Sequence, residues 1–523
     1  MKSVLAGFRP LSRRRFIQGS AAAGSAALFS GCATSSGTTA IVIGSGFGGA
    51  VAALRLGQAG IRTRILERGQ RWTIDPAGGT FSGNLPPDNR STWMRTESIA
   101  PIGPTFAFAR EHTGVLDRID LKGMQIYAGA GVGGGSLVYG GMTVPPSREL
   151  FQSAFGDLVD FDEMDEVYFP RVRSMLNVSR VPDDVLESEM YKIARIAIEQ
   201  IGKAGFEHQL IGQATDWDVI RAELSGDIPA SATIGELIYG ANSGYKNSLD
   251  KNYLPAAEAT GNVSIHPLHQ VDRIEAKKRG YLVHVSELTP DGDVSATRKF
   301  YCDMLFVAAG SVNTTRLLVE ARARGDLPNL DSSVGSEWGA NGNTMFIRTE
   351  INEDTGVQGV PPILATLDLE NAYAPMIVEQ APFPVQDNCA CMLQVAVVGD
   401  PRRGEFAYDP ETDRAILDWP GEGHGPTVVR AAEDHMRRMI EANGGVMGHD
   451  WIPEPTTHFS YHPSGGVPIP TAADSFGRVE GYEDLYVVDG ALLPGTASAA
   501  NPSLQIAALA ERAMDEILLS YLG

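Results

Sequence analysis

The most regular pattern of apolar and polar positions lies close to residue 40. Residues 40–43 are four consecutive apolar residues, which predict a buried strand of a parallel sheet. A glycine-rich turn follows, and the apolar run 50–56 predicts a helix that ends at Gly60. Residues 61–67 then return as a second strand. This succession of strand, helix and strand is typical of a doubly wound α/β sheet.

Two later segments repeat the order of a strand followed by a helix. Within residues 303–321 an apolar strand runs into Gly310, and a helix is expected from about Thr314. Within residues 483–517 a strand ends at Asp489, and a long amphipathic helix follows after a loop. Both strands are expected to join the same sheet as the first two.

The last helix has a clear start signal. Pro502 suits its first turn, and Asn501 would lie near its N-cap. Asp489 and Gly490 end the preceding strand, where an acid can hydrogen-bond the ribityl chain of a flavin.

The glycines after the first strand fit the G-x-G-x-x-G fingerprint of dinucleotide-binding proteins. Gly44 allows the tight turn, Gly46 lets the backbone approach a pyrophosphate, and Gly49 permits close packing of helix on strand. The helix N-terminus offers free N–H groups to the phosphates. Glu67 ends the second strand 23 residues after Gly44, where its carboxylate can accept both ribose hydroxyls. The sequence therefore predicts a dinucleotide site but does not decide between FAD and NAD.

A second glycine cluster occupies residues 127–142 and is not followed by a helix and an acid like the first. It is therefore not a second unit of the same kind. Its small residues instead suggest backbone pressed against something flat or anionic. Its predicted cofactor contacts are Gly129, Gly131, Gly134, Gly135 and Ser136, with Gly310 from the later strand.

Charge is distributed unevenly along the 523 residues. The formal net charge is −21, yet residues 1–37 hold five basic side chains and no acid, so the rest carries −26. Such an acidic body repels phosphate backbones, and nucleic acid is not expected as a partner.

The basic N-terminal segment resembles an export signal. Residues 12–18 read SRRRFIQ, like a twin-arginine signal, and a modest apolar run leads to Cys32 in LFSGC, which resembles a bacterial lipobox. We expect twin-arginine export and an extracytoplasmic location, with a lipid on Cys32 as a candidate membrane anchor. The alternatives are simple cleavage nearby or a disordered basic tail.

Metal binding is not expected. His458 and His462 are four residues apart, but Pro463 disfavours a regular helix and the acid of an H-E-x-x-H motif is absent. Cys389 and Cys391 lack a second pair of ligands, so thiols are expected there.

Motifs spread from about residue 39 to the C-terminus carry a more specific resemblance. The chain resembles the GMC-type flavin oxidoreductases, and among them the bacterial cholesterol oxidases that bind FAD non-covalently. The matching stretches include GVGGGSLV, IYGANSGYKNSLDKNYL, WGANGN, EQAPFP, YHPSGG and NPSLQIAALAER. Several of these are not general to flavoproteins.

The resemblance implies non-covalent FAD, oxidation of a sterol 3β-hydroxyl to the ketone, and reduction of O2 to H2O2. It places His462 and Asn501 beside the substrate hydroxyl, and Glu379 where a proton moves during a Δ5 to Δ4 isomerisation. An imidazole can accept or orient the hydroxyl proton, and an amide can hold the hydroxyl in line. Each residue has a plainer alternative: a loop histidine for His462, a helix cap for Asn501, and a surface acid for Glu379.

Two departures limit what the resemblance implies. Tyr139 stands where these enzymes carry asparagine beside the flavin, and residues 209–232, expected to cover the steroid cavity, match only loosely. A dehydrogenase of another hydrophobic or polyol alcohol that reduces a quinone or cytochrome therefore stays open. A non-catalytic flavin- or sterol-binding lipoprotein is a third alternative.

The expected fold is α/β, with two domains after a signal and tether of residues 1–37. A discontinuous Rossmann-like FAD domain takes residues 38–150, 244–343 and 456–523. A substrate domain takes residues 151–243 and 344–455, with a mainly antiparallel sheet and helices around an apolar steroid cavity.

Overall fold

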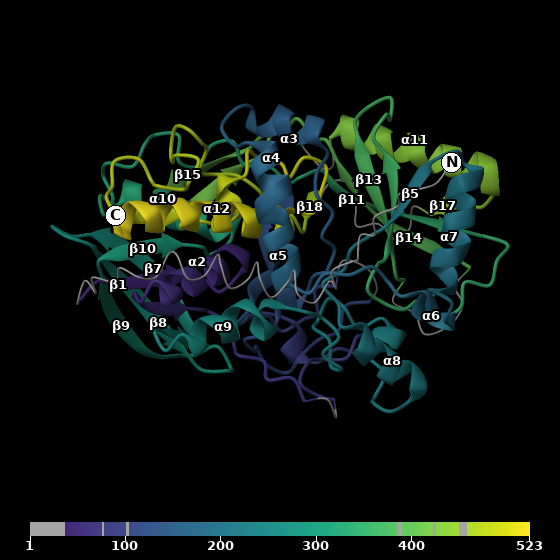
Figure 1. Ribbon diagram of the computed structural model, residues 1–523, viewed down its shortest axis with the longest axis horizontal. Coiled ribbons are helices and arrows are strands. Elements are labelled where there is room, and N and C mark those ends of the chain that lie inside the picture. Colours follow the sequence, from purple (N-terminus) through teal and green to yellow (C-terminus); the bar gives the residue numbers. More distant parts are fainter. Residues whose placement is uncertain are drawn as a thin grey trace, which may run out of the picture. The chain divides into compact units, whose positions relative to one another are not determined.

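A parallel sheet of five strands carries the glycine fingerprint (Figure 1). The computed structural model describes residues 37–75, 78–100, 104–383, 390–421, 425–448 and 458–522. The strands lie in the order β19-β10-β1-β2-β6 and comprise Leu485–Val487, Met304–Val307, Thr39–Ile43, Arg62–Leu66 and Val263–His266. All neighbours are parallel. The predicted strands at 40–43 and 61–67, and the two before Gly310 and Asp489, are therefore confirmed.

Both faces of this sheet are covered, which explains why its strands are continuously apolar. Ala40 and Val42 of β1 pack in the core under the helices α2 (Phe47–Gln58), α9 (Tyr253–Ala259) and α12 (Pro502–Leu522). Ile41 and Ile43 point the other way, as the twofold period of a strand requires. There they pack against α10 (Ser311–Ala323) and the sheet β7-β8-β9 (His269–Ala276, Tyr281–Leu288, Val294–Cys302).

Two helices begin earlier than the apolar pattern predicts. Helix α2 starts at Phe47 rather than at residue 50, and α10 starts at Ser311 rather than Thr314. Glycine is a poor helix former, so the first turn of α2 gives no periodic signal. It is nevertheless needed there, because a Cβ at Gly48 would lie 1.7 Å from the carbonyl oxygen of Val488.

A second sheet of six strands is antiparallel throughout. Its order is β17-β11-β14-β13-β12-β5, which comprise Val446–Gly448, Asn343–Thr349, Met392–Val398, Met376–Ala381, Leu364–Asp368 and Glu207–Leu210. Helix α11 (Pro426–Asn443) lies beside this sheet (Figure 1), and Phe346, Val378 and Ala396 on one face pack under it. The opposite face of this sheet lines a cavity. The predicted antiparallel sheet is therefore present, while the predicted domain boundaries stay a prediction, since Thr39–Gly523 forms one compact unit.

The other elements are smaller. Strands β3 (Leu116–Leu121), β4 (Met124–Gly129) and β18 (His458–Ser460) form one sheet, and β15 (Glu405–Asp409) and β16 (Arg414–Asp418) form a hairpin. The remaining helices are α3 (Arg148–Phe155), α4 (Phe161–Glu163), α5 (Phe169–Met175), α6 (Asp183–Leu186), α7 (Lys192–Lys203) and α8 (Trp217–Ser225). Within the described ranges, no helix combines the length and apolar character that crossing a membrane requires.

The predictions for the export signal and for the cysteines concern other parts of the chain. The predicted export signal and Cys32 lie outside the described residues, so both stay predictions, and so does Cys389. Cys391 takes part in a disulfide, so the expectation of a thiol is wrong at that position. Cys302 is a free, buried thiol.

Candidate active site

A large cavity is lined by residues of both main sheets. Ile43 and Leu66, at the ends of β1 and β2, line it together with Met345, Glu379 and Val395 of the antiparallel sheet. Its volume is about 1500 Å³. Pockets for one drug-sized molecule measure roughly 300–1,000 Å³, so this cavity has room for more than one ligand.

Two uncapped helix N-termini face the cavity. Gly46 precedes α2 and Gly310 precedes α10, and neither helix has a side-chain cap. Both glycines line the cavity, and a Cβ added at either one would meet no protein atom within 4 Å. Free N–H groups beside open space are a typical site for a pyrophosphate. Gly44 also lines the wall, so Gly44, Gly46 and Gly310 all line the cavity, and their contacts with a cofactor stay a prediction.

Two buried carboxylates follow strands of the parallel sheet and also line the cavity. Glu67 accepts hydrogen bonds from the backbone N–H and the hydroxyl of Ser45, at 3.0 and 2.7 Å. Asp489 accepts from the N–H of Gly310 at 2.8 Å and from the hydroxyl of Thr314 at 2.5 Å. Burial raises the pKa of Asp489. These positions suit a ribose and a ribityl chain, the contacts predicted for them.

The second glycine cluster follows β4 and turns through a short 3-10 helix, Gly134–Leu137. Gly129, Gly134 and Gly135 line the cavity, and so does Gly490. A Cβ at Gly134 would lie 2.9 Å from the Cα of Gly46, so the two glycine loops touch backbone to backbone. The backbone of the second glycine cluster was predicted to press against another surface, and part of that surface is the loop at Gly46.

Three residues predicted to contact the cofactor do not line the cavity. A Cβ at Gly49 would lie 2.2 Å from the carbonyl oxygen of Gly44, so Gly49 serves helix packing. Gly131 is buried behind the loop. The hydroxyl of Ser136 accepts from the N–H of Leu249 at 3.0 Å and is fully buried. All three residues face other parts of the protein. The glycine pattern in the sequence does not show which residues face protein and which face a cavity.

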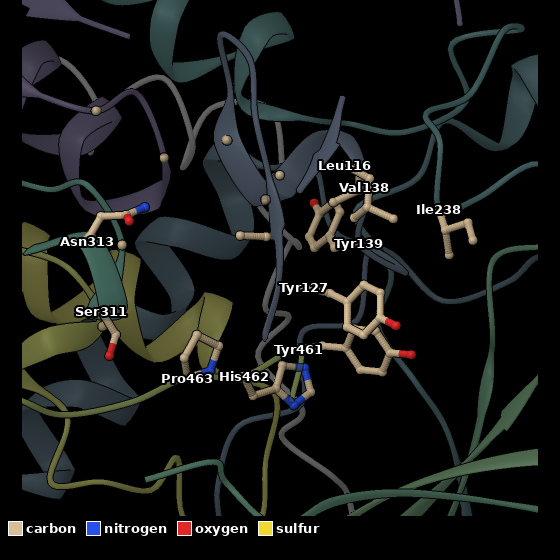
Figure 2. A pocket seen from close by; sticks show the side chains of 18 of the residues that line it. Leu116, Tyr127, Val138, Tyr139, Ile238, Ser311, Asn313, Tyr461, His462 and Pro463 are labelled. Carbon is tan, nitrogen blue, oxygen red and sulfur yellow. The ribbon is translucent and has the colours of Figure 1, made fainter. Parts of the chain in front are cut away.

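His462 follows β18, and its ring lies in the cavity (Figure 2). Its Nδ1 lies 2.9 Å from Nδ2 of Asn343. The Oδ1 of Asn343 accepts from the N–H of Tyr461 at 3.0 Å, so its Nδ2 must be the donor to His462. Burial lowers the pKa of His462 to about 4. The neutral ring therefore carries its proton on Nε2 and is a hydrogen-bond donor there.

Glu379 is buried in the middle of the antiparallel sheet, not on the surface. It is 6% exposed and lines the cavity, and its Oε1 has no hydrogen-bond partner among the residues that the structure describes. Burial raises the pKa of Glu379 to about 7, although a hydrogen bond from the side chain of Asn501 opposes this rise. A carboxyl with that pKa can take up or release a proton near neutral pH.

Asn501 directly precedes α12 and lines the cavity. Asn341 fixes its place: the Nδ2 of Asn341 donates to the carbonyl of Ala500 at 2.9 Å, and its Oδ1 accepts from the N–H of Ala497 at 2.7 Å. The motif WGANGN contains both Asn341 and Asn343. The signal for these two supporting residues was therefore present in the sequence, but their partners are more than 100 residues away.

One part of the remaining wall is apolar and aromatic (Figure 2). Another part is charged and comprises Arg68, Asp272, Arg273, Arg316, Glu320, Arg324, Asp413 and Arg414. Tyr139 lines it as well, with its ring 5.6 Å from that of Phe47 and its buried hydroxyl without a partner. The other apolar and aromatic members include Leu116, Tyr127, Val138, Leu237, Ile238, Tyr239, Met345, Phe383, Leu393, Val395 and Tyr461.

Residues 209–232 do not line the cavity, contrary to expectation. The next segment does, through Leu237, Ile238 and Tyr239. Glu223 of α8 holds the start of this segment, because its carboxylate accepts the backbone N–H groups of residues 231–233. The role of 209–232 is therefore support, which explains why its sequence needs no apolar cavity pattern.

Replacing Gly46 with alanine is expected to weaken FAD binding without weakening the fold. The backbone at Gly46 has φ −70°, which alanine adopts freely, and the added methyl would point into the cavity. We expect at least a tenfold rise in the dissociation constant for FAD, about 1.4 kcal/mol. Titration of the FAD-free protein measures this, and Gly202→Ala in α7 is the control outside the cavity, because a Cβ there also meets nothing within 4 Å and the φ of Gly202 is not positive. An unchanged affinity would contradict the predicted role.

The comparisons with known proteins agree with this arrangement. Residues 30–321 match the GMC oxidoreductase family, residues 341–452 match its C-terminal part, and residues 413–510 match it again. A fungal aryl-alcohol oxidase has the same fold, with a TM-score of 0.62 at 14% identity over 93% of this chain and 99% of that one. Pyridoxine 4-oxidase from Mesorbium loti gives 0.60 at 14% identity, over 92% and 99%.

Relatives found by sequence include cholesterol oxidases. That of Mycobacterium tuberculosis H37Rv is 26% identical over 90% of each chain, and that of Acinetobacter baumannii is 23% identical over 91% of this chain and 94% of its own. With more than half of its length matched to one family, the chain belongs to the GMC oxidoreductases, which are FAD-dependent alcohol-oxidising flavoenzymes.

Proposed function

We propose that this protein oxidises the 3β-hydroxyl of a sterol to a ketone, with O2 reduced to H2O2 and FAD bound non-covalently. The observation that carries the proposal is Glu379: a buried carboxyl with a pKa of about 7, whose Oε1 has no partner among the described residues, in a cavity with an apolar and aromatic wall. The cholesterol oxidases among the relatives support the choice of a sterol.

The residues around the cavity fit FAD. Gly46 and Gly310 would hold the pyrophosphate, Glu67 the ribose and Asp489 the ribityl chain. When bound, FAD supplies the acceptor for the two electrons of the alcohol and passes them to oxygen. Non-covalent binding is supported by the cavity lining, which among the described residues contains no cysteine and only the histidines His269 and His462.

The substrate hydroxyl would meet three side chains: His462, Asn501 and Glu379. The Nε2–H of His462 can donate to the alcohol oxygen, which orients it, and Asn501 offers an amide to hold it in line. Glu379 can accept the hydroxyl proton on its unpartnered Oε1 as the C–H bond breaks. The sequence left two roles open for His462, accepting the hydroxyl proton or orienting the hydroxyl. In this proposal His462 orients it.

The same carboxyl suits an isomerisation that follows oxidation. A β,γ-unsaturated ketone becomes conjugated when a proton leaves the carbon beside the carbonyl and returns to the far carbon of the double bond. Glu379 can carry that proton, because its pKa of about 7 lets it accept and release it.

The test is anaerobic mixing of the purified yellow protein with cholesterol. Loss of the oxidised flavin absorbance, then H2O2 release on adding O2, is the expected result, and enone absorbance would report isomerisation. The 3α epimer is the matched control substrate. Flavin loss with dye reduction but no peroxide would favour a dehydrogenase that reduces a quinone or cytochrome. No reaction with any sterol would exclude the proposal.

A further inference from the structure

Tyr239 lines the cavity and carries an unsatisfied hydroxyl. The residue is 2% exposed, and its hydroxyl is buried with no well-aligned hydrogen-bond partner among the described residues. Burial raises the pKa of this phenol, so it keeps its proton and is available as a donor. A buried hydroxyl without a partner is costly, which points to a partner that the protein itself does not supply.

The surroundings of Tyr239 contain other donors. Tyr127 and Ala100, both lining the cavity, are its neighbours, and the backbone N–H of Ala100 approaches the oxygen of Tyr239, which leaves the hydroxyl hydrogen to be donated elsewhere. Tyr127 lies beside Arg118, whose guanidinium is paired with Asp120 at 2.9 Å. Ser98 also lines the cavity; its oxygen accepts from the N–H of Phe106 at 2.9 Å, and its hydrogen has no acceptor among the described residues. Hydroxyl hydrogens that lack an acceptor in the protein call for an acceptor oxygen from a ligand.

Tyr127, and the residue before Tyr239 in the chain, lie away from the nucleotide side of the cavity. Figure 2 shows Ile238, the neighbour of Tyr239 in the chain, on the side opposite Ser311 and Asn313. The hydroxyls of Tyr127 and Tyr461 point toward that same side. Their rings are 5.3 Å apart, so they form one wall.

Lys246 holds this wall in place. Its Nζ donates to the carbonyls of Leu137 and Leu237 at 2.9 and 2.6 Å and so ties the second glycine loop to the segment that carries Tyr239. Lys246 is itself 4% exposed. Lys246 therefore fixes the backbone of the segment that carries Tyr239 beside the second glycine loop.

We propose that Tyr239 marks a second polar subsite, which binds a carbonyl or carboxylate oxygen at the end of the substrate remote from the reacting hydroxyl. This inference rests on the proposed oxidation of a sterol and narrows it. The preferred substrate is then a 3β-hydroxysteroid with an oxidised or shortened side chain, rather than one whose side chain is a hydrocarbon.

The test compares three 3β-hydroxy-Δ5 substrates that differ in the side chain: cholesterol, pregnenolone with its ketone, and 3β-hydroxy-5-cholenoic acid with its carboxylate. In the holoenzyme, Tyr239→Phe should lower kcat/KM about tenfold for the ketone and the acid and leave it unchanged for cholesterol. Tyr281→Phe is the matched control, because its buried hydroxyl donates to the carbonyl of Glu483, outside the cavity. Equal effects on all three substrates would overturn the subsite.

Two further measurements separate this inference from the proposed oxidation. Progesterone has a side-chain ketone but no 3β-hydroxyl, so its binding does not depend on turnover, and Tyr239→Phe should weaken it about tenfold. If no sterol reduces the flavin but this loss occurs, the subsite stands and the oxidation fails. The ligand-free Tyr239→Phe protein should melt at the same temperature or higher, because an unpaired hydroxyl is removed. A lower melting temperature would mean that the hydroxyl already has a partner, and would contradict the subsite.

Discussion

Replacing Glu379 with glutamine is expected to slow flavin reduction by the alcohol about 10²–10⁴-fold, the usual contribution of a general base. Glutamine keeps the size and the hydrogen bond to Asn501 but cannot accept a proton. Anaerobic stopped-flow at saturating substrate measures the step directly. Conversion of a supplied Δ5-3-ketone to the enone should fall as well, since the same carboxyl is proposed to move that proton.

The pH dependence follows from the same group. The pKa of Glu379 is raised to about 7, so the carboxylate form is lost as pH falls below that value. Flavin reduction should therefore rise about tenfold per pH unit up to pH ~7 and then level off. The Glu379→Gln variant should lack this limb. If the rate of flavin reduction in the variant still rose with pH up to pH ~7, a group other than Glu379 would be the base.

The free energy of unfolding should fall as pH rises, whereas the rate of flavin reduction should rise. The folded protein holds the Glu379 proton up to pH ~7, whereas the unfolded chain releases it near 4.5, so folding loses stability as pH rises between these values. A shift of this size corresponds to about 3 kcal/mol. Glu379→Gln should therefore stabilise the protein above pH 7 while it abolishes the fast reaction. Denaturant unfolding at pH 5 and pH 8 measures the difference.

The sequence predicted the parts of this molecule that repeat a local pattern. The strands of the parallel sheet, the turn at Gly44 and the start of α12 follow from short runs of apolar residues, glycine and proline. Gly49 shows where this reasoning stops. The fingerprint identifies it, but only the packing of α2 on β1 shows that it contacts protein and not the cavity.

The residues that set the chemistry depend on contacts between distant segments. Glu379 was assigned from one short motif, and nothing local shows that it is buried or that its pKa is raised. Asn343 controls the proton position on His462 across 119 residues. Tyr239 lies just beyond the segment expected to cover the cavity. In each case the environment, and not the residue type, decides the role, and an environment built by folding has no local sequence signal.

Removing the imidazole of His462 is expected to cost about 10²–10³-fold in flavin reduction, as loss of one well-placed donor does. Because Asn343 donates to Nδ1, the proton of the neutral ring is on Nε2 and the ring acts as a donor. His462→Gln supplies an amide N–H and should retain more activity than His462→Ala. If His462 were instead the base, both variants would be equally slow.

The proton position can be checked without turnover. In protein labelled with ¹⁵N-histidine, the ring of residue 462 should show a protonated Nε2 and an unprotonated Nδ1, unchanged from pH 8 down to about pH 5. That range follows from its pKa of about 4, which burial produces. Asn343→Asp offers Nδ1 an acceptor, so the proton should move to Nδ1 and the pKa should rise, because a carboxylate beside the ring favours its charged form. Flavin reduction would then fall with the ring still present. An Nδ1 proton in the unmodified protein would instead make Nε2 an acceptor and return the role of base to His462.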